Sequence, residues 1–134
     1  MKALIITDGT DSIQSIALLI KNTLTDCKSV ICSAQDFTGT EILPTDIFFI
    51  GCENPSPKSF AFLEKMLSHI NLAPRKCGVF SVNQKSVKYL QTIIKTCEAT
   101  AIEPFLTQIG LYQTSLVKKA DLQKWLKQLP PVAK

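Results

Sequence analysis

The run Lys2-Ala3-Leu4-Ile5-Ile6-Thr7, followed by Asp8-Gly9-Thr10-Asp11-Ser12, decides how the rest of the sequence is interpreted. The first segment is short, apolar and rich in β-branched residues, which is typical of a buried strand, and the second is a turn cluster. Beyond it, apolar residues recur at helical spacing: Ile13, Ile16, Ala17, Ile20 and Leu24. We expect an amphipathic helix there, capped by Asp11 or Ser12. In α/β sheets, ligands bind at such strand-to-helix loops.

The same alternation continues along the chain. Further strands are predicted at 29–34, 46–52, 77–82 and 100–106, and further helices around 57–70, 86–97 and 122–129. Strands alternating with helices imply a parallel sheet with helices on both faces. Right-handed crossovers favour a three-layer, doubly wound α/β fold with five strands in the order 2-1-3-4-5. Pro104 lacks a ladder donor, so the fifth strand should lie at an edge.

Local signals refine these boundaries. Ser56 before Pro57 and, later, Ser86 have the chemistry of helix N-caps, so we expect them to begin the second and third of the four predicted helices. Phe60 and Trp125 fall on apolar stripes and are predicted to lie in the core. No repeat or linker divides the sequence, which we interpret as a single domain spanning residues 1–134.

Composition limits the classes of function. The net charge is +4, and residues 118–134 carry all of it, with five lysines against one aspartate. This is interpreted as a solvated helix face. Arginines are few and no aromatic residues alternate with the basic ones, so no nucleic acid partner is expected, and no apolar run approaches the roughly 18 residues of a membrane span, so no membrane partner is expected. A single histidine argues against a metal site. Five cysteines without a C-x-x-C motif favour reduced thiols, and with a strand at the start of the chain we expect a cytoplasmic protein.

Three loops should converge where the strand order reverses: 8–12, 52–58 and 82–86. The residues predicted to line this edge are Thr7, Asp8, Gly9, Thr10, Asp11, Ser12, Cys52, Asn54, Ser81 and Asn83. Cys52 has no flanking His or Arg to lower the pKa of its thiol, so a buried structural role is preferred over a reactive one. Asp8 and Asp11 are interpreted first as a turn former and a helix cap.

Several segments together carry a resemblance: Lys2–Thr7, Ile16-Ala17, Asp46–Gly51, Pro57-Lys58 with Phe60 and Phe62-Leu63, and Gly78–Val82. With them the sequence resembles the flavodoxin-like family, that is, small flavodoxins and related oxidase domains. The resemblance covers most of the chain. It rests on core segments, so it implies fold more than function.

In that family the first loop binds the phosphate of flavin mononucleotide (FMN) with the pattern Thr-x-Thr-Gly-Asn-Thr. The ungapped match here is Asp8–Ile13, in which Thr10 keeps its hydroxyl and Ser12 replaces asparagine. Asp8 and Asp11 stand where a hydroxyl and the glycine are usual. A two-residue insertion would instead align Gly9 with the glycine. Either register leaves two carboxylates near the phosphate, each repelling it by roughly 3 kcal/mol at ~4–6 Å and an effective dielectric of ~20.

Two hypotheses remain. We favour a flavodoxin-like domain with a degenerate FMN site, acting as a non-catalytic binding or interaction module for an anionic small molecule or a regulatory protein. The alternative is an FMN-binding electron carrier with an atypical phosphate loop and a redox partner. The loops at 53–56 and 83–86 contain no aromatic residue to stack on a flavin, and Tyr112 lies in a connector of uncertain form. If the loop chemistry weakens the site, Asp11→Gly with Ile13→Thr should raise flavin affinity.

Overall fold

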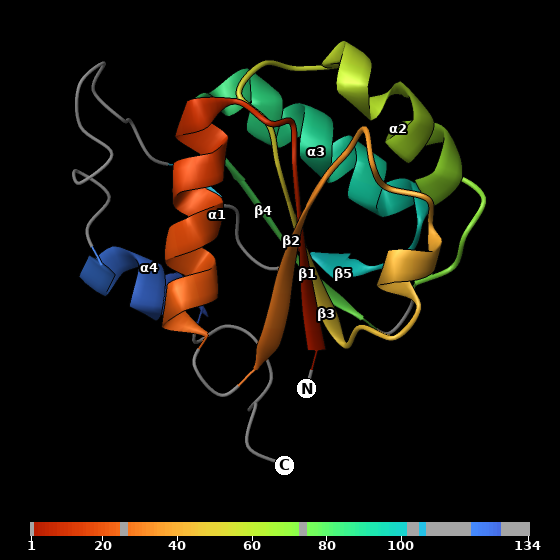
Figure 1. Ribbon diagram of the computed structural model, residues 1–134. Helices are drawn as coiled ribbons and strands as arrows, with labels where there is room; N and C mark the ends of the chain where they lie inside the picture. Colours follow the sequence, from red (N-terminus) through yellow and green to blue (C-terminus); the bar gives the residue numbers. More distant parts are fainter. Residues whose placement is uncertain (1, 25–26, 73–74, 102–104, 107–118, 127–134) are drawn as a thin grey trace.

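The computed structural model describes residues 2–24, 27–72, 75–101, 105–106 and 119–126. Its sheet has four strands of five or six residues: β1 (Lys2–Thr7), β2 (Lys28–Ser33), β3 (Ile47–Gly51) and β4 (Lys76–Ser81). They are parallel and lie in the order β2-β1-β3-β4 (Figure 1). All four agree with the sequence prediction to within one residue at each end. The parallel sheet and the order of its first four strands are confirmed.

The predicted fifth strand, 100–106, is wrong as a continuous element. Two two-residue segments, β5 (Thr100–Ala101) and β6 (Phe105–Leu106), take its place, and both pair in parallel with β4. The first pairs with the beginning of β4 and the second with its end. Pro104 itself lies outside the described residues, but a proline has no N–H for a continuous ladder. The sheet therefore has four full strands instead of five.

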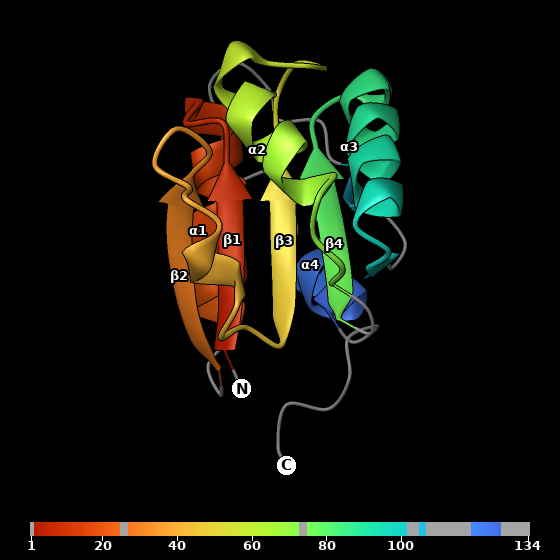
Figure 2. The ribbon, with the colours of Figure 1, turned by 90° about the vertical axis from the view of Figure 1, so that its right-hand side faces the viewer.

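Helices cover both faces of the sheet, as the three-layer prediction required. α1 (Asp11–Thr23) and α4 (Lys119–Leu126) lie on one face. α2 (Ala61–Leu67), preceded by the 3-10 turn η2 (Lys58–Phe60), and α3 (Gln84–Thr96) lie on the other (Figures 1 and 2). The link from β2 to β3 holds one 3-10 turn, η1 (Thr40–Ile42), where a helix could have covered the sheet.

Each face has its own core. Beneath α2 and α3 the sheet contributes Leu4, Ile6, Phe48, Ile50 and Val79. Phe60 belongs to this cluster and is fully buried, as predicted. Beneath α1 and α4 lie Ala3, Ile5, Ile47, Phe49 and Phe80. Trp125 is 4% exposed and its ring centroid is 5.6 Å from that of Phe49, which confirms its predicted role as the core anchor of α4.

The three predicted helix caps are wrong. Thr10 is the N-cap of α1, and its hydroxyl donates to Asp8 instead of accepting from the helix, while Asp11 already lies within the first turn. Pro57, not Ser56, precedes η2. Asn83 caps α3 by accepting the Ser86 N–H at 2.8 Å. In each case the helix or turn begins one to three residues away from the expected cap. The hydroxyls of Ser12 and Ser86 donate to Glu53 of another loop instead of capping a helix.

Candidate functional site

The loops after β1, β3 and β4 meet at the carboxyl edge of the sheet, and Glu53 joins them. Its backbone N–H donates to Asp8 Oδ2 at 2.8 Å, and its side chain accepts from Ser12 Oγ at 2.9 Å. Its backbone carbonyl accepts from Asn83 Nδ2 and, at 2.9 Å, from Ser86 Oγ. Glu53, in the loop after β3, therefore contacts both of the neighbouring loops.

Asp8 is the centre of the first loop. One carboxylate oxygen accepts the Thr10 N–H at 3.1 Å and the Thr10 hydroxyl at 2.6 Å, which closes a turn over Gly9. The other oxygen accepts from Glu53. The turn-forming role predicted for Asp8 is thus present. In addition, its negative charge is held by the same kinds of donor, backbone N–H and hydroxyl, that bind an anion at a helix start.

Gly9 has a φ of +83°, which an L side chain rarely adopts, so the tight turn depends on glycine. Its N–H lies 3.3 Å from Thr7 Oγ1. The Thr7 hydroxyl itself donates to Gln14 Oε1 at 2.6 Å, and Thr7 is fully buried. Thr7 consequently supports the loop from below and does not line the edge.

Ser81 and Cys52 are also buried beneath the edge. Ser81 Oγ donates to the Cys52 carbonyl at 2.6 Å and lies 3.3 Å from the Asn83 N–H. Burial, helped by the negative charge of Asp8 and opposed by a hydrogen bond from Ser86, raises the pKa of the Cys52 thiol to about 12. Such a thiol stays protonated at neutral pH, which agrees with the structural role predicted for it.

The sequence-predicted residues therefore divide into three groups, and Thr7, Cys52 and Ser81, buried beneath the edge, are the first. Asp8, Thr10, Ser12 and Asn83 are brought together through Glu53. Asn54 and Asp11 are exposed, and Gly9 supplies backbone only. Sequence reasoning missed Glu53 and Ser86 as site residues, although the position of Glu53, directly after the most apolar strand, was a usable signal.

The loops of this edge carry three carboxylates and two lysines, Lys58 and Lys85, so their net charge is two minus three, or −1. Asp8, Asp11 and Glu53 lie in or beside the contacting loops. Within the described parts of those loops there is no aromatic side chain that could stack on a flavin ring. Phe60 is buried, and Tyr89 donates to Glu64 on the outer face of the helices, where burial and the Glu64 charge raise the pKa of the phenol. Tyr112 lies outside the described residues.

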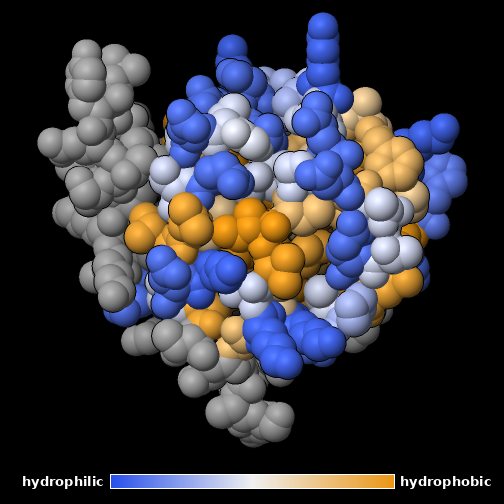
Figure 3. Space-filling view, in the orientation of Figure 1, coloured by the Kyte–Doolittle hydropathy of each residue, from blue (hydrophilic) through white to orange (hydrophobic). Residues whose placement is uncertain are grey.

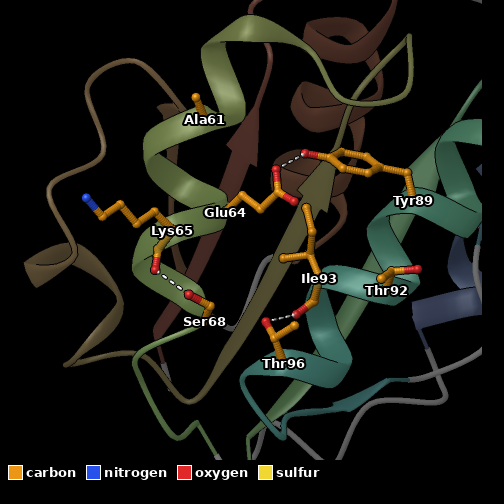
Figure 4. Close-up of a pocket in the computed structure, with 8 residues that line it drawn as sticks. All are labelled: Ala61, Glu64, Lys65, Ser68, Tyr89, Thr92, Ile93 and Thr96. Carbon is orange, nitrogen blue, oxygen red and sulfur yellow. Dashed lines mark hydrogen bonds between the residues drawn. The ribbon is translucent and has the colours of Figure 1, made fainter.

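A separate pocket of about 360 Å³ lies between α2 and α3 (Figure 4). Helix α2 contributes Ala61, Glu64, Lys65 and Ser68, and helix α3 contributes Tyr89, Thr92, Ile93 and Thr96. Its hydroxyls are bonded within the protein: Tyr89 to Glu64, Ser68 to the Lys65 carbonyl and Thr96 to the Ile93 carbonyl. This pocket is on the helical face, and its Tyr89 also interacts with Ser56 in the loop after β3.

Two further features concern only the part of the chain that the structure describes. It contains no group of three or more His, Cys, Asp or Glu side chains placed to hold a metal ion. It also contains no helix with the length and apolar character needed to cross a membrane.

Sequence comparisons give no relatives: no family model matches the chain, and no curated protein does. Solved structures do match. Oxidised flavodoxin 2 from Bacillus cereus has a TM-score of 0.81 at 19% identity, over 96% of this chain and all of that one (100%). The flavodoxin of Streptococcus pneumoniae TIGR4 has a TM-score of 0.78 at 13% identity over 96% of both chains. A short-chain flavodoxin associated with a bacterial microcompartment also scores 0.78, at 14% identity, over 96% of this chain and 97% of that one.

At such identities the likeness concerns the fold alone. It extends over almost the whole chain. With its parallel sheet between two helical layers, the chain has the α/β fold of the flavodoxins.

Proposed function

We propose that this protein is a binding or interaction module built on the flavodoxin fold, with a degenerate FMN site. The observation that carries the proposal is the position of Asp8. Its carboxylate accepts two donors from the first loop and one from Glu53. An FMN phosphate bound at this loop would need backbone N–H and hydroxyl donors of the same kind. The Asp8 carboxylate already occupies these donors, and its negative charge would repel the phosphate.

The electrostatic cost supports the same conclusion. A carboxylate ~5 Å from one negative charge of the phosphate repels it by roughly 3 kcal/mol at an effective dielectric of ~20. Asp8, Asp11 and Glu53 all belong to this edge. A net binding free energy of about −8 kcal/mol corresponds to micromolar affinity, so two such terms remove most of it. The residues present therefore do not fit the phosphate of FMN.

An FMN-binding electron carrier is the second candidate. Its support is the fold, which solved flavodoxins share over 96% of this chain, and the left-handed turn at Gly9, which keeps the first loop tight. On this alternative the hydroxyls of Thr10 and Ser12 would hold the phosphate, once Thr10 had left Asp8 and Ser12 had left Glu53.

The experiment that separates the two is the visible spectrum of the purified protein, followed by titration with FMN and with riboflavin, monitored by flavin fluorescence. We expect a colourless protein that is unsaturated at millimolar FMN. Asp8→Ser should bind FMN at least tenfold more tightly, with little change for riboflavin, because only FMN carries the phosphate. Asp46→Ser removes a carboxylate at the opposite end of the strands and should change neither affinity.

A yellow protein, or saturation of the unaltered chain at micromolar FMN, would overturn the degenerate-site proposal in favour of the electron carrier. The pair Asp11→Gly and Ile13→Thr, suggested by the sequence pattern, is a poor test. Ile13 is fully buried against β1 and β3 in the core beneath α1, so threonine there would lower the stability of the fold as a whole.

A further inference from the structure

One face of β2 has no helix over it, and a groove of about 380 Å³ has formed there. The residues from 34 to 46, between β2 and β3, contain only η1. Parallel sheets are normally covered on both faces. Here Val30, in the middle of β2, keeps 60% of its surface exposed. Figure 3 shows apolar surface in the centre of the face on which β2 lies in Figure 1, bordered by hydrophilic side chains.

The floor and one wall of the groove are apolar. Leu4 of β1 and Val30 of β2 are register partners, so their side chains lie next to each other on the same face of the sheet. Most of the accessible apolar surface is that of Val30, because Leu4 is only 2% exposed. Pro44 lines the groove from the β2–β3 connection.

Two lysines stand at one end of this floor. Lys2 and Lys28 are also register partners, and adjacent strands are only about 4.8 Å apart. Lys2 precedes Leu4 by two residues, and Lys28 precedes Val30 by two. Because side chains alternate along a strand, both lysines lie on the same face of the sheet as Leu4 and Val30. Because the two side chains leave the sheet at neighbouring positions on one face, both ammonium groups can reach an anion bound at this end of the groove.

The acidic groups nearby have other partners. Glu41 lines the groove, but its carboxylate accepts the Thr38 N–H at 3.0 and 3.2 Å and the Thr38 hydroxyl at 2.9 Å. Asp46 accepts the backbone N–H of Lys2 at 2.9 Å. Among the described residues, no carboxylate forms an ion pair with either lysine ammonium.

We propose that this groove binds a small amphipathic anion, with a carboxylate, sulfonate or phosphate between Lys2 and Lys28 and an apolar body over Leu4 and Val30. The volume sets the size of the occupant. At about 30 Å³ for each water-sized unit, 380 Å³ holds roughly a dozen non-hydrogen atoms, which corresponds to a short acyl chain or a two-ring compound. The site is separate from the carboxyl edge, since it involves the first residues of β1 and β2.

The test uses the full chain and two probes that match this size, the two-ring naphthalene-2-sulfonate followed by fluorescence, and octanoate as competitor. We expect saturable 1:1 binding of the sulfonate and its displacement by octanoate, with octanol at least tenfold weaker because it lacks the charge. The double variant Lys2→Gln and Lys28→Gln should lower affinity for both anions about tenfold. Lys76→Gln, at the same end of the sheet but on its opposite face, should leave affinity unchanged.

Val30→Thr provides a second, independent variant, because it keeps the shape and β-branching of an exposed residue and removes apolar contact. It should weaken octanoate binding several-fold without altering the far-UV circular dichroism spectrum. Equal affinity of the double lysine variant and the unaltered chain would overturn the proposal. So would equal displacement by octanol and octanoate, or octanoate affinity unaffected by Val30→Thr.

Discussion

At the scale of single residues, two glycines in the sheet lie directly under aromatic rings. A Cβ on Gly51 would overlap the ring of Phe80, and one on Gly78 would lie 2.8 Å from Phe49 Cδ1 and from Trp125 Cζ2. Both contacts belong to the core beneath α1 and α4. Because the rings are packed against other buried side chains, they have little room to move, and the absence of a side chain is what lets α4 approach the sheet.

Gly78→Ala tests this packing. We expect a loss of about 1–3 kcal/mol in the free energy of unfolding, measured by urea denaturation, and a shift in the fluorescence of Trp125, the single tryptophan. Gly9→Ala is the matched control: no atom lies within 4 Å of its added Cβ, and its cost, about 1 kcal/mol, comes from the positive φ. An unchanged stability of Gly78→Ala would show that the aromatic layer is loosely packed.

Cys52 allows a prediction about alkaline pH. Its pKa is raised to about 12, first by burial and then by the charge of Asp8, from an ordinary value of 9.0. The folded state therefore holds the thiol proton more tightly than the unfolded chain. This contribution to stability is complete below pH 9 and is lost as the pH rises toward 12. Between pH 8 and 10 the chain should lose about 1 kcal/mol more than Cys52→Ala does, as measured by urea midpoints. If the urea midpoints of the unaltered chain and of Cys52→Ala fell in parallel with rising pH, the prediction would be refuted.

At the scale of elements, the short connection between β4 and α3 both begins a helix and forms one side of the site. Asn83 accepts the Ser86 N–H as N-cap and donates through Nδ2 to the Glu53 carbonyl. The loop has only Val82 and Asn83 between strand and helix. There is consequently no length of chain here to enclose a ring, which agrees with the proposal of a degenerate flavin site.

Asn83→Ala should lower the free energy of unfolding by about 1–2 kcal/mol, because it removes the cap and the tie to Glu53 together. Asn83→Asp keeps an acceptor for the cap and loses only the donor, so its cost should be clearly smaller. Thermal unfolding followed by circular dichroism gives both values. Equal losses in the two variants would mean that the cap contributes little.

At the scale of the whole molecule, α4 closes the second face of the sheet although it follows a segment outside the described residues. Trp125 and Leu126 pack into the same cluster as Ile13, Ile16 and Phe49. In Figures 1 and 2 this helix lies beside α1, on the side of the sheet opposite α2 and α3. The last helix thus completes the three-layer arrangement.

Trp125→Ala should reduce the free energy of unfolding by about 3–5 kcal/mol, the usual cost of deleting a buried aromatic ring. Trp125→Phe keeps a ring against Phe49 and should lose less than half as much. Urea unfolding followed by circular dichroism measures both without relying on tryptophan fluorescence. A loss below about 1 kcal/mol for the alanine variant would show that the fold is stable without α4.

The sequence by itself determined the layered α/β fold. Apolar runs at β1, β3 and β4 and the helical spacing of Ile13, Ile16 and Ile20 are local patterns, and burial of both sheet faces follows from them. Strand order followed because right-handed crossovers leave few alternatives. The form of the predicted fifth strand was harder to predict from the sequence. Pro104 predicts a weak strand, but it does not predict two short segments that pair separately with β4.

Only the tertiary structure decided the chemistry of the edge. Spacing along the chain placed Asp8, Ser12 and Asn83 in converging loops, but it could not show that Glu53 joins them, because its partners are 30 to 45 residues away in sequence. The same holds for the helix caps and for the uncovered groove on β2. A polar side chain in a loop has several partners within reach, and which one it binds depends on how distant segments pack against each other.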